Sequence, residues 1–443
     1  MTQVSTQPES GKIPIQKRAE IYFFTGVYLL IAGTIFPTFR AMLIGHEGAS
    51  SIYEYIVSAI PDIAILVYTA GSFALRLNLG RPASFPLLLA DKILLFASLY
   101  AVLVGSFLSA DFKYIIYGLR MSYIPILMYL AIRNLQEFLD EQVYLKGLSI
   151  FMHWLFITSI IGLLLYFPFS ELEQKLKTIV HASRSSYHIP RLNSIYHAPT
   201  LNGAYMSIAA AYFSIRFLQK VNYKTAIILS LVLINLLLSV SRGGILAYII
   251  ILPGVIYFMR KWKSSLILAG IIVVSVIAGL RAVNLSPDKA GWIFKSSAGT
   301  LKMDKTQTRV KLWDSTYSTL ERHPFGLGLG KSGWVANRFV KESNEETAFS
   351  ATDGWYLKTA NEIGIPGLLF FMIFFAFLGW SLFRNSNFLE PGISFYIMIL
   401  FIQVMLLNIV SNTLDYFVFN SFFWMCTAIS MSEGIKIKKI IKK

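Results

Sequence analysis

Charged side chains are scarce in this sequence: Asp, Glu, Lys and Arg make up only 14% of its 443 residues, whereas hydrophobic residues make up 55%. A soluble protein of this length carries about a quarter charged residues. The mean hydropathy is +0.58, and apolar runs of membrane length recur from end to end. These features exclude an ordinary soluble domain and predict an all-α polytopic membrane protein.

Cysteine is almost absent too, because Cys426 is the single one, which excludes an internal disulfide and a thiolate metal cluster. The motifs of metal catalysis, such as His-Glu-x-x-His, are missing. We therefore expect neither a metal nor another cofactor. Acidic residues are outnumbered, with 24 Asp and Glu against 40 Lys and Arg. Loops that face anionic lipid explain this excess, so no nucleic-acid partner is indicated.

Apolar segments long enough to cross the hydrocarbon core, about 20 residues each, number about twelve. The first six lie near 21–37, 58–75, 86–107, 114–132, 147–170 and 194–217. The other six lie near 224–240, 243–259, 264–283, 356–380, 393–413 and 415–432. The chain is thus divided into spans at 21–283, a long loop at 284–355 and further spans at 356–432, between tails at 1–20 and 433–443.

Basic residues gather in every second connection. They are Lys12, Lys17 and Arg18 in the first tail, then Arg76, Arg81, Arg133, Lys146, Lys220, Lys224, Arg260, Lys261, Lys263 and Arg384 in the connections. The closing stretch KIKKIIKK is basic as well. Cytoplasmic loops carry such an excess of Lys and Arg. We therefore expect both termini to be cytoplasmic.

Two segments on the opposite, outer side are long and polar: 171–193 and 284–355. Loops of such length are usually functional or disordered. The second segment is too rich in aromatic residues to be disordered, so we expect a small folded helical cap on the outer face. From it the chain enters the stretch SATDGWYLKTANEIGIPGLLFF, whose polar half therefore faces outward.

Arginines on the outer side run against the charge rule and need their own explanation. Arg242 lies in SVSRGGILAY, between two spans with almost no loop, and two glycines allow a tight turn there. Arg309 lies on a predicted amphipathic helix whose apolar side carries Val310, Trp313, Tyr317 and Leu320. Arg242 has a simpler interpretation as a group that reaches lipid headgroups.

Further candidates flank these two. The helix is predicted to end at Arg322 and His323, before the run HPFGLGLG, which we expect to form an extended, exposed turn. Arg322 and His323 could instead only satisfy the helix carbonyls. Arg191 precedes the span at 194–217 and is either a functional residue or part of a polar connector. Because guanidinium groups bind phosphate oxygens bidentately, these arginines indicate a site for a diphosphate-linked lipid.

The motifs SRGG, RVKLW, HPFGLGLG and DGWYLKTANEIGIPGLLFF together resemble the O-antigen ligase/polymerase superfamily, over roughly 191–371. The resemblance implies a GT-C type membrane glycosyltransferase of the bacterial inner membrane, which uses polyprenyl-diphosphate-linked glycans and transfers them with inversion. It also implies that Arg242 and Arg309 bind the lipid diphosphate. Ligases usually carry a histidine just before the Tyr-Leu pair, but this chain has Asp353-Gly354 there. This departure favours a repeat-unit polymerase over a ligase.

Asp353 has two interpretations. Its carboxylate could take the proton from an acceptor hydroxyl, or it could cap the helix that follows. Trp334, Trp355 and Tyr356 could stack on sugars or anchor the chain at the membrane interface. Asn361 and Glu362 are expected to have structural roles.

The predicted partners are a polyprenyl-diphosphate-linked oligosaccharide, a glycan or lipid A–core acceptor, the bilayer and a chain-length regulator. The alternatives are a ligase that acts on lipid A–core or another acceptor, and a flippase or other transporter. A transporter would bury charges within its spans, where the sequence has Asp62, Asp91, Lys92 and Arg120.

Overall fold

The computed structural model describes residues 14–44, 52–82, 87–109, 111–167, 191–196, 198–284, 304–333 and 354–441. These residues form helices joined by short connections, and no β-strand occurs among them. The predicted all-α membrane fold is confirmed.

Each of the twelve predicted apolar segments coincides with a helix or a continuous helical run. In the first half these are α1 (Ile15–Ile44), α2 (Ile52–Asn78), α3 (Leu89–Ser109), the run α4 (Phe112–Gly118), η1 (Leu119–Tyr123), η2 (Ile124–Ile126) and α5 (Leu127–Leu135), α6 (Glu141–Tyr166) and α8 (Pro199–Gln219). In the second half they are α9 (Tyr223–Leu238), α10 (Arg242–Met259), α11 (Trp262–Asn284), α15 (Trp355–Asn385), α16 (Ile393–Val410) and α17 (Phe417–Ile441). Two short turns, η3 (Ser194–Tyr196) and η5 (Thr413–Asp415), and the helix α13 (Asp304–Arg322) complete the described chain.

Nine helical segments of the described chain are long and apolar enough to cross a membrane. Two shorter apolar helices, Tyr223–Leu238 and Phe417–Met431, accompany them. The remaining predicted span is α8, which is buried along nearly its whole length inside the bundle. The chain is therefore a multi-pass membrane protein, and the count of twelve crossings stays a prediction.

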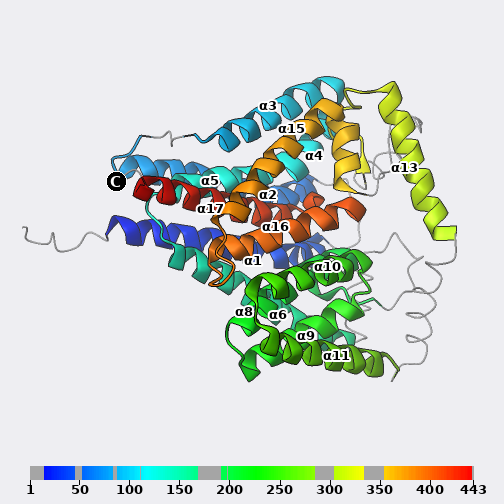
Figure 1. Cartoon of the computed structure of the whole chain (residues 1–443). Coiled ribbons are helices and arrows are strands. Elements are labelled where there is room, and N and C mark those ends of the chain that lie inside the picture. Colours follow the sequence, from blue (N-terminus) through cyan, green and yellow to red (C-terminus); the bar gives the residue numbers. More distant parts are fainter. Residues whose placement is uncertain are drawn as a thin grey trace, which may run out of the picture.

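The helices form two groups that meet along α16 (Figure 1). Helices α2, α3, α5, α15 and α17 pack together on one side, and α6, α8, α9, α10 and α11 on the other. Helix α16 contacts α15, α17, α10 and α8, and 72% of its apolar window is buried. It is the central helix of the bundle.

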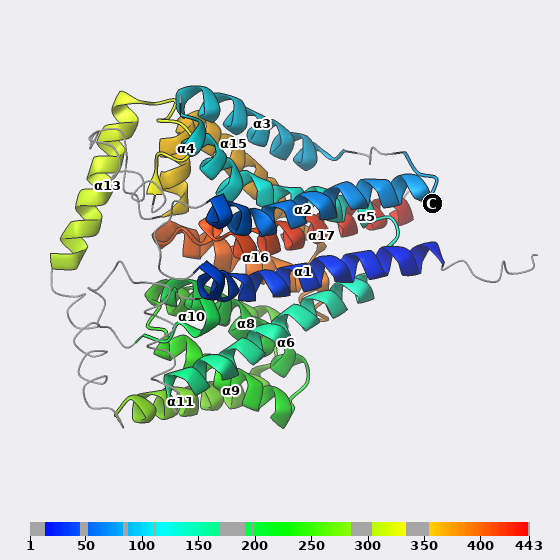
Figure 2. The ribbon, with the colours of Figure 1, turned by 180° about the vertical axis from the view of Figure 1, so that it is seen from behind.

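The two ends of the bundle differ. Figures 1 and 2 show α13 lying across one end, which we call the α13 end, while α1 begins and α17 finishes at the opposite end. Because α9 and α16 finish, and α10 and α15 begin, at the α13 end, the connections between them gather there. The expected helix in the segment 284–355 is thus present as α13.

Several charged side chains within the bundle are paired with one another. Arg133 is fully buried and holds Asp91 bidentately, with Nε–Oδ1 and Nη2–Oδ2 distances of 2.9 and 2.5 Å. Arg120 Nε lies 2.6 Å from Asp62 Oδ2. Arg76, 2% exposed, contacts Glu137 at 3.2 Å. Arg76 and Arg133 were expected to face lipid at a cytoplasmic loop, but acidic partners in the turn after α5 and on α3 draw both into the core.

Candidate active site at the α13 end

The turn between α9 and α10 brings Arg242 to the α13 end. Val240 has φ +50°, a left-handed conformation that reverses the chain within three residues. Ser241 is the N-cap of α10, yet its side chain makes no capping hydrogen bond. Arg242 is the first residue of α10 and is exposed. A guanidinium group thus lies beside a helix N-terminus, an arrangement that favours an anion.

Arg191 bonds to the protein backbone, although it was predicted to bind phosphate. Its Nε donates to the carbonyl of Ser239 at 3.0 Å, and its Nη2 donates to the carbonyl of Val240 at 2.9 Å. Both carbonyls belong to the turn that follows α9, which ends at Leu238. Arg191 therefore holds the turn that carries Arg242.

Close packing of α8 against the turn fixes it further. A Cβ atom on Gly203 would lie 2.0 Å from Cβ of Ser241, and one on Gly244 would lie 2.6 Å from the Gly203 carbonyl oxygen. Asn202 donates to the Leu192 carbonyl and to Asn235 Oδ1, at 3.1 and 2.9 Å. Such close contact of small residues with buried amide bonds is typical of membrane helices.

Two of the predicted site residues, Arg309 and Arg322, belong to helix α13, and a third, His323, follows it directly. Arg309 lies within α13, and its side chain is outside the described part of the chain. Arg322 and His323 are both exposed at the last turn. Thr316 and Leu320 are buried, whereas Tyr317 is 56% exposed. The sequence predicted that Tyr317 would lie on the buried face of α13. In the structure Thr316 lies on that face instead.

The glycine-rich segment after α13, residues 324–333, is named here the glycine strap. It was expected to be an exposed turn, but Gly326, Gly328, Leu329 and Gly330 are buried. Its amides bond to the membrane helices: Leu329 N donates to the Gly105 carbonyl at 2.9 Å. The expectation of exposure was wrong for these four residues, because the strap fills a gap in α15, whereas His323, Pro324 and Phe325 are exposed.

That gap is a break in α15 at Gly364, whose φ of +75° and ψ of 174° are not helical. The break frees the carbonyls of Asn361 and Glu362. They accept hydrogen bonds from Leu327 N and Gly328 N of the strap, at 2.7 and 3.0 Å. In return Ile365 N donates to the Pro324 carbonyl at 3.0 Å. Broken backbone at membrane depth is tolerated where protein satisfies it in this way.

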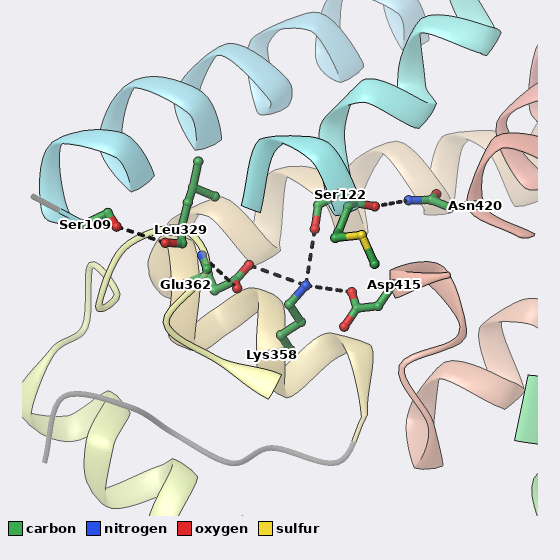
Figure 3. A network of polar contacts seen from close by, with 9 residues as sticks. Ser109, Ser122, Leu329, Lys358, Glu362, Asp415 and Asn420 are labelled. Carbon is green, nitrogen blue, oxygen red and sulfur yellow. Dashed lines mark hydrogen bonds and ion pairs between the residues drawn. The ribbon is translucent and has the colours of Figure 1, made fainter. Parts of the chain in front are cut away.

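A buried ionic cluster lies beside the strap (Figure 3). Lys358 Nζ is 2.6 Å from Asp415 Oδ1, 3.7 Å from Glu362 Oε2 and 3.3 Å from Ser122 Oγ. Glu362 also accepts from Gly330 N of the strap, at 3.1 Å. Lys358 and Glu362 are 2% and 3% exposed. The cluster joins α15, η5, η1 and the strap.

Sequence reasoning assigned Glu362 a structural role but missed Lys358 and Asp415. A signal for Lys358 was present in the sequence. Lys358 and Glu362 are four residues apart, which is the spacing of an ion pair on one helix face. Asp415 is more than fifty positions away in the chain, so no local pattern links it to Lys358.

Two predicted site residues, Asp353 and Trp334, lie outside the described residues. The helix next to Asp353 begins at Trp355, and Gly354 occupies its N-cap position without a side-chain cap. Tyr356 donates from its hydroxyl to the Met405 carbonyl at 3.1 Å. Its polar end is therefore directed to α16, and α15 is fixed to α16 at this point.

The final residues of α16 connect the two sides of the candidate site. A Cβ atom on Gly243 of the α9–α10 turn would lie 3.1 Å from Val410, and one on Gly354 would lie 2.7 Å from the Ile409 carbonyl oxygen. The turn that carries Arg242 and the start of α15 thus pack on the same end of one helix. The structure brings these two elements together at the α13 end, together with Arg191.

One comparison with known proteins finds a family for part of the chain. Residues 227–372 match the family model described as O-antigen ligase. The match covers about a third of the chain, from α9 to the broken part of α15, and confirms the resemblance to the O-antigen ligase/polymerase superfamily. Arg242, Arg309 and Lys358 fall within it, whereas Arg191 and Asp415 lie outside. No curated protein matches the chain.

Proposed function

We propose that this chain, whose residues 227–372 match the O-antigen ligase family, is a membrane glycosyltransferase that polymerises polyprenyl-diphosphate-linked oligosaccharide repeat units. It acts at the outer face of a bacterial inner membrane, with both termini in the cytoplasm. The observation that carries the proposal is the α9–α10 turn. There Arg242 is exposed in the first turn of α10, whose N-cap side chain makes no capping hydrogen bond, and Arg191 donates to two carbonyls of the same turn.

The proposed chemistry uses charge neutralisation by arginine. Arg242 and Arg309 bind the diphosphate of the donor and stabilise it as the leaving group. An acceptor hydroxyl oxygen attacks the anomeric carbon from the opposite face. The new C–O bond forms as the bond from the anomeric carbon to the phosphate oxygen breaks, which inverts the configuration. Asp353 accepts the hydroxyl proton, and the polyprenyl diphosphate leaves.

Arg191 is not proposed as a direct ligand. Its guanidinium group is engaged by the carbonyls of Ser239 and Val240, so it acts through the position of Arg242. Arg322 and His323, exposed at the end of α13, and Trp334 are proposed to contact the glycan. Tyr356 bonds to Met405 and is proposed to hold α15 in place.

A ligase is the second candidate, because the matching family is described as O-antigen ligase. The two activities differ in the acceptor, which is lipid A–core for a ligase and another lipid-linked glycan for a polymerase. The chain has no histidine after His323, which favours the polymerase. A transporter is disfavoured, because Asp62 and Asp91 of the spans are paired with Arg120 and Arg133 rather than arranged along a path.

The activity is tested with purified protein in liposomes that contain a polyprenyl-diphosphate-linked repeat unit, with and without lipid A–core. A polymerase yields a ladder of products from the lipid-linked substrate alone. Products that require lipid A–core would identify a ligase instead. If neither mixture yields a longer or transferred glycan, the proposed function is wrong.

The residue test is Arg242→Ala. Removing one charged group that stabilises a leaving diphosphate is expected to lower the transfer rate by about 10²–10³-fold. Initial rates in the same liposomes measure this. The matched control is Arg281→Ala, since Arg281 is also exposed and lies in the last turn of α11; it should retain the full rate. Equal rates for both variants would contradict a diphosphate site at Arg242.

A further inference from the structure

Lys358 is placed where it cannot meet a substrate. Its side chain is 2% exposed, and its ammonium group is surrounded by Asp415, Glu362 and Ser122 (Figure 3). A lysine buried at this depth persists only when charged partners compensate for lost hydration. Two carboxylates on either side of one ammonium group fulfil that condition. Lys358 is therefore not a catalytic residue.

The first partner of Lys358 leads to α13. Glu362 accepts a hydrogen bond from Gly330 of the glycine strap at 3.1 Å. A Cβ atom on Gly333, three residues further, would lie 3.2 Å from Cδ of Lys358, so the strap backbone packs on the lysine stem. The strap continues directly from the last turn of α13. The position of the C-terminal end of α13 thus depends on this cluster.

The second partner leads to the turn of Arg242. Asp415 belongs to η5, which follows α16 after a gap of two residues. The last residue of α16, Val410, is the one that Gly243 approaches. Thr200, in the first turn of α8, lies 3.4 Å from the hydroxyl of Tyr416, the residue next to Asp415. Asp415 is therefore tied to the elements that support Arg242.

We propose that Lys358 is a positioning residue that fixes α13 relative to the α9–α10 turn, through Glu362 and the strap on one side and Asp415 on the other. Its role in catalysis rests on the proposed function, in which Arg309 of α13 and Arg242 of the turn bind one diphosphate. Two cations on separate elements bind one anion tightly only when their separation is fixed. Lys358 sets that separation.

The test measures the distance between the two elements directly. Spin labels are placed at Ser318→Cys on α13 and Leu246→Cys on α10, two exposed positions, while the buried Cys426 stays unlabelled. The test variant is Asp415→Asn, which removes the charge from the shortest contact of Lys358 and leaves the neutral pair Lys358–Glu362. Electron–electron distance measurements should show a broadened or shifted distribution in this variant.

A second variant tests the proposal in case Asp415→Asn alone does not fold. Lys358→Met with Glu362→Gln and Asp415→Asn removes all three charges together, a change that buried clusters often tolerate. It should broaden the distribution as well. Lys358→Arg, which retains the charge, should keep the wild-type distribution. If Asp415→Asn or the triple variant folds and gives the wild-type distribution, Lys358 does not position α13.

The control is a buried ion pair elsewhere in the bundle. Arg133→Met with Asp91→Asn removes a pair that is as buried as Lys358, and it should leave the distance unchanged. A change in this control equal to that in Asp415→Asn would overturn the proposal, because it would mean a general loosening of the bundle.

Kinetics separate this proposal from the proposed function. If wild-type protein transfers glycan, Asp415→Asn should raise the KM for the lipid-linked donor by about tenfold, with a smaller change in kcat. An unchanged donor KM would contradict the positioning role. If the wild type transfers no glycan but the distance changes as expected, the proposed function fails and the structural role of Lys358 remains.

Discussion

At the scale of single residues, two arginines at one turn have different tasks. Arg242 is exposed at the start of α10, whereas Arg191 donates to two carbonyls at the end of α9. Both were predicted to bind the diphosphate, since both are outer arginines next to spans. Residue type alone cannot separate them, because a guanidinium group matches a pair of carbonyls as well as a phosphate.

Arg191→Ala is expected to lower the free energy of unfolding by on the order of 2–3 kcal/mol, because the carbonyls of Ser239 and Val240 lose charge-assisted hydrogen bonds. Cys426 is buried, so a fluorogenic maleimide that reacts with it reports thermal unfolding in detergent. Arg191→Lys should give a smaller loss, since lysine cannot donate to both carbonyls from a planar fork. Unchanged unfolding together with weaker donor binding would instead make Arg191 a ligand.

Local patterns of the candidate site could be predicted from the sequence, but contacts between distant segments could not. The Ser-Arg-Gly turn is local, so its glycines and its arginine are visible as a pattern. Lys358 and Asp415 meet only after α15 and α16 have packed together. Contacts of that kind depend on tertiary structure, and no spacing rule in one sequence reveals them.

At the scale of elements, the main feature is the exchange of backbone hydrogen bonds between α15 and the glycine strap. Helix α15 is interrupted at Gly364, and the strap supplies the hydrogen bonds that the interruption removes. The sequence predicted the turn after α13 but not its burial. Glycines carry no apolar side chain to signal a buried face, and the strap is buried through its backbone.

Gly364→Ala tests this fit. The residue has φ +75°, and a Cβ atom would lie 2.5 Å from backbone atoms of Phe325 and Pro324. We expect unfolding to become easier by about 2 kcal/mol or more, from backbone strain and displacement of the strap. The Cys426 maleimide assay measures the change.

Gly270→Ala is the matched control. Gly270 lies inside α11, and a Cβ atom added there would have no other atom within 4 Å. Alanine there should stabilise the helix by about 0.5–1 kcal/mol. Equal effects of the two substitutions would mean that the strap does not restrict Gly364.

At the scale of the whole molecule, the order of apolar segments was the most predictable property. All twelve predicted segments coincide with helical segments, because the hydrophobic requirement of a bilayer acts on every span independently. The helix ends were less predictable: α1 and α17 extend beyond the predicted limits. Orientation in the membrane is a separate property, and the basic residues predict it.

Single-cysteine labelling tests the orientation, with Cys426 replaced by alanine. A membrane-impermeant maleimide added to spheroplasts should label Ser318→Cys on α13. Lys263→Cys, exposed at the start of α11, should react only after the membrane is permeabilised. The reverse pattern would mean that α13 faces the cytoplasm, which would contradict the proposed function at the outer face.

The contact between Lys358 and Asp415 also has a consequence for biogenesis. Lys358 is synthesised more than fifty residues before Asp415, so the start of α15 enters the membrane region with a lysine that lacks its nearest carboxylate. The bundle can close only when α16 and η5 have followed. Until η5 has left the ribosome, Lys358 therefore has Glu362 alone of its two carboxylate partners.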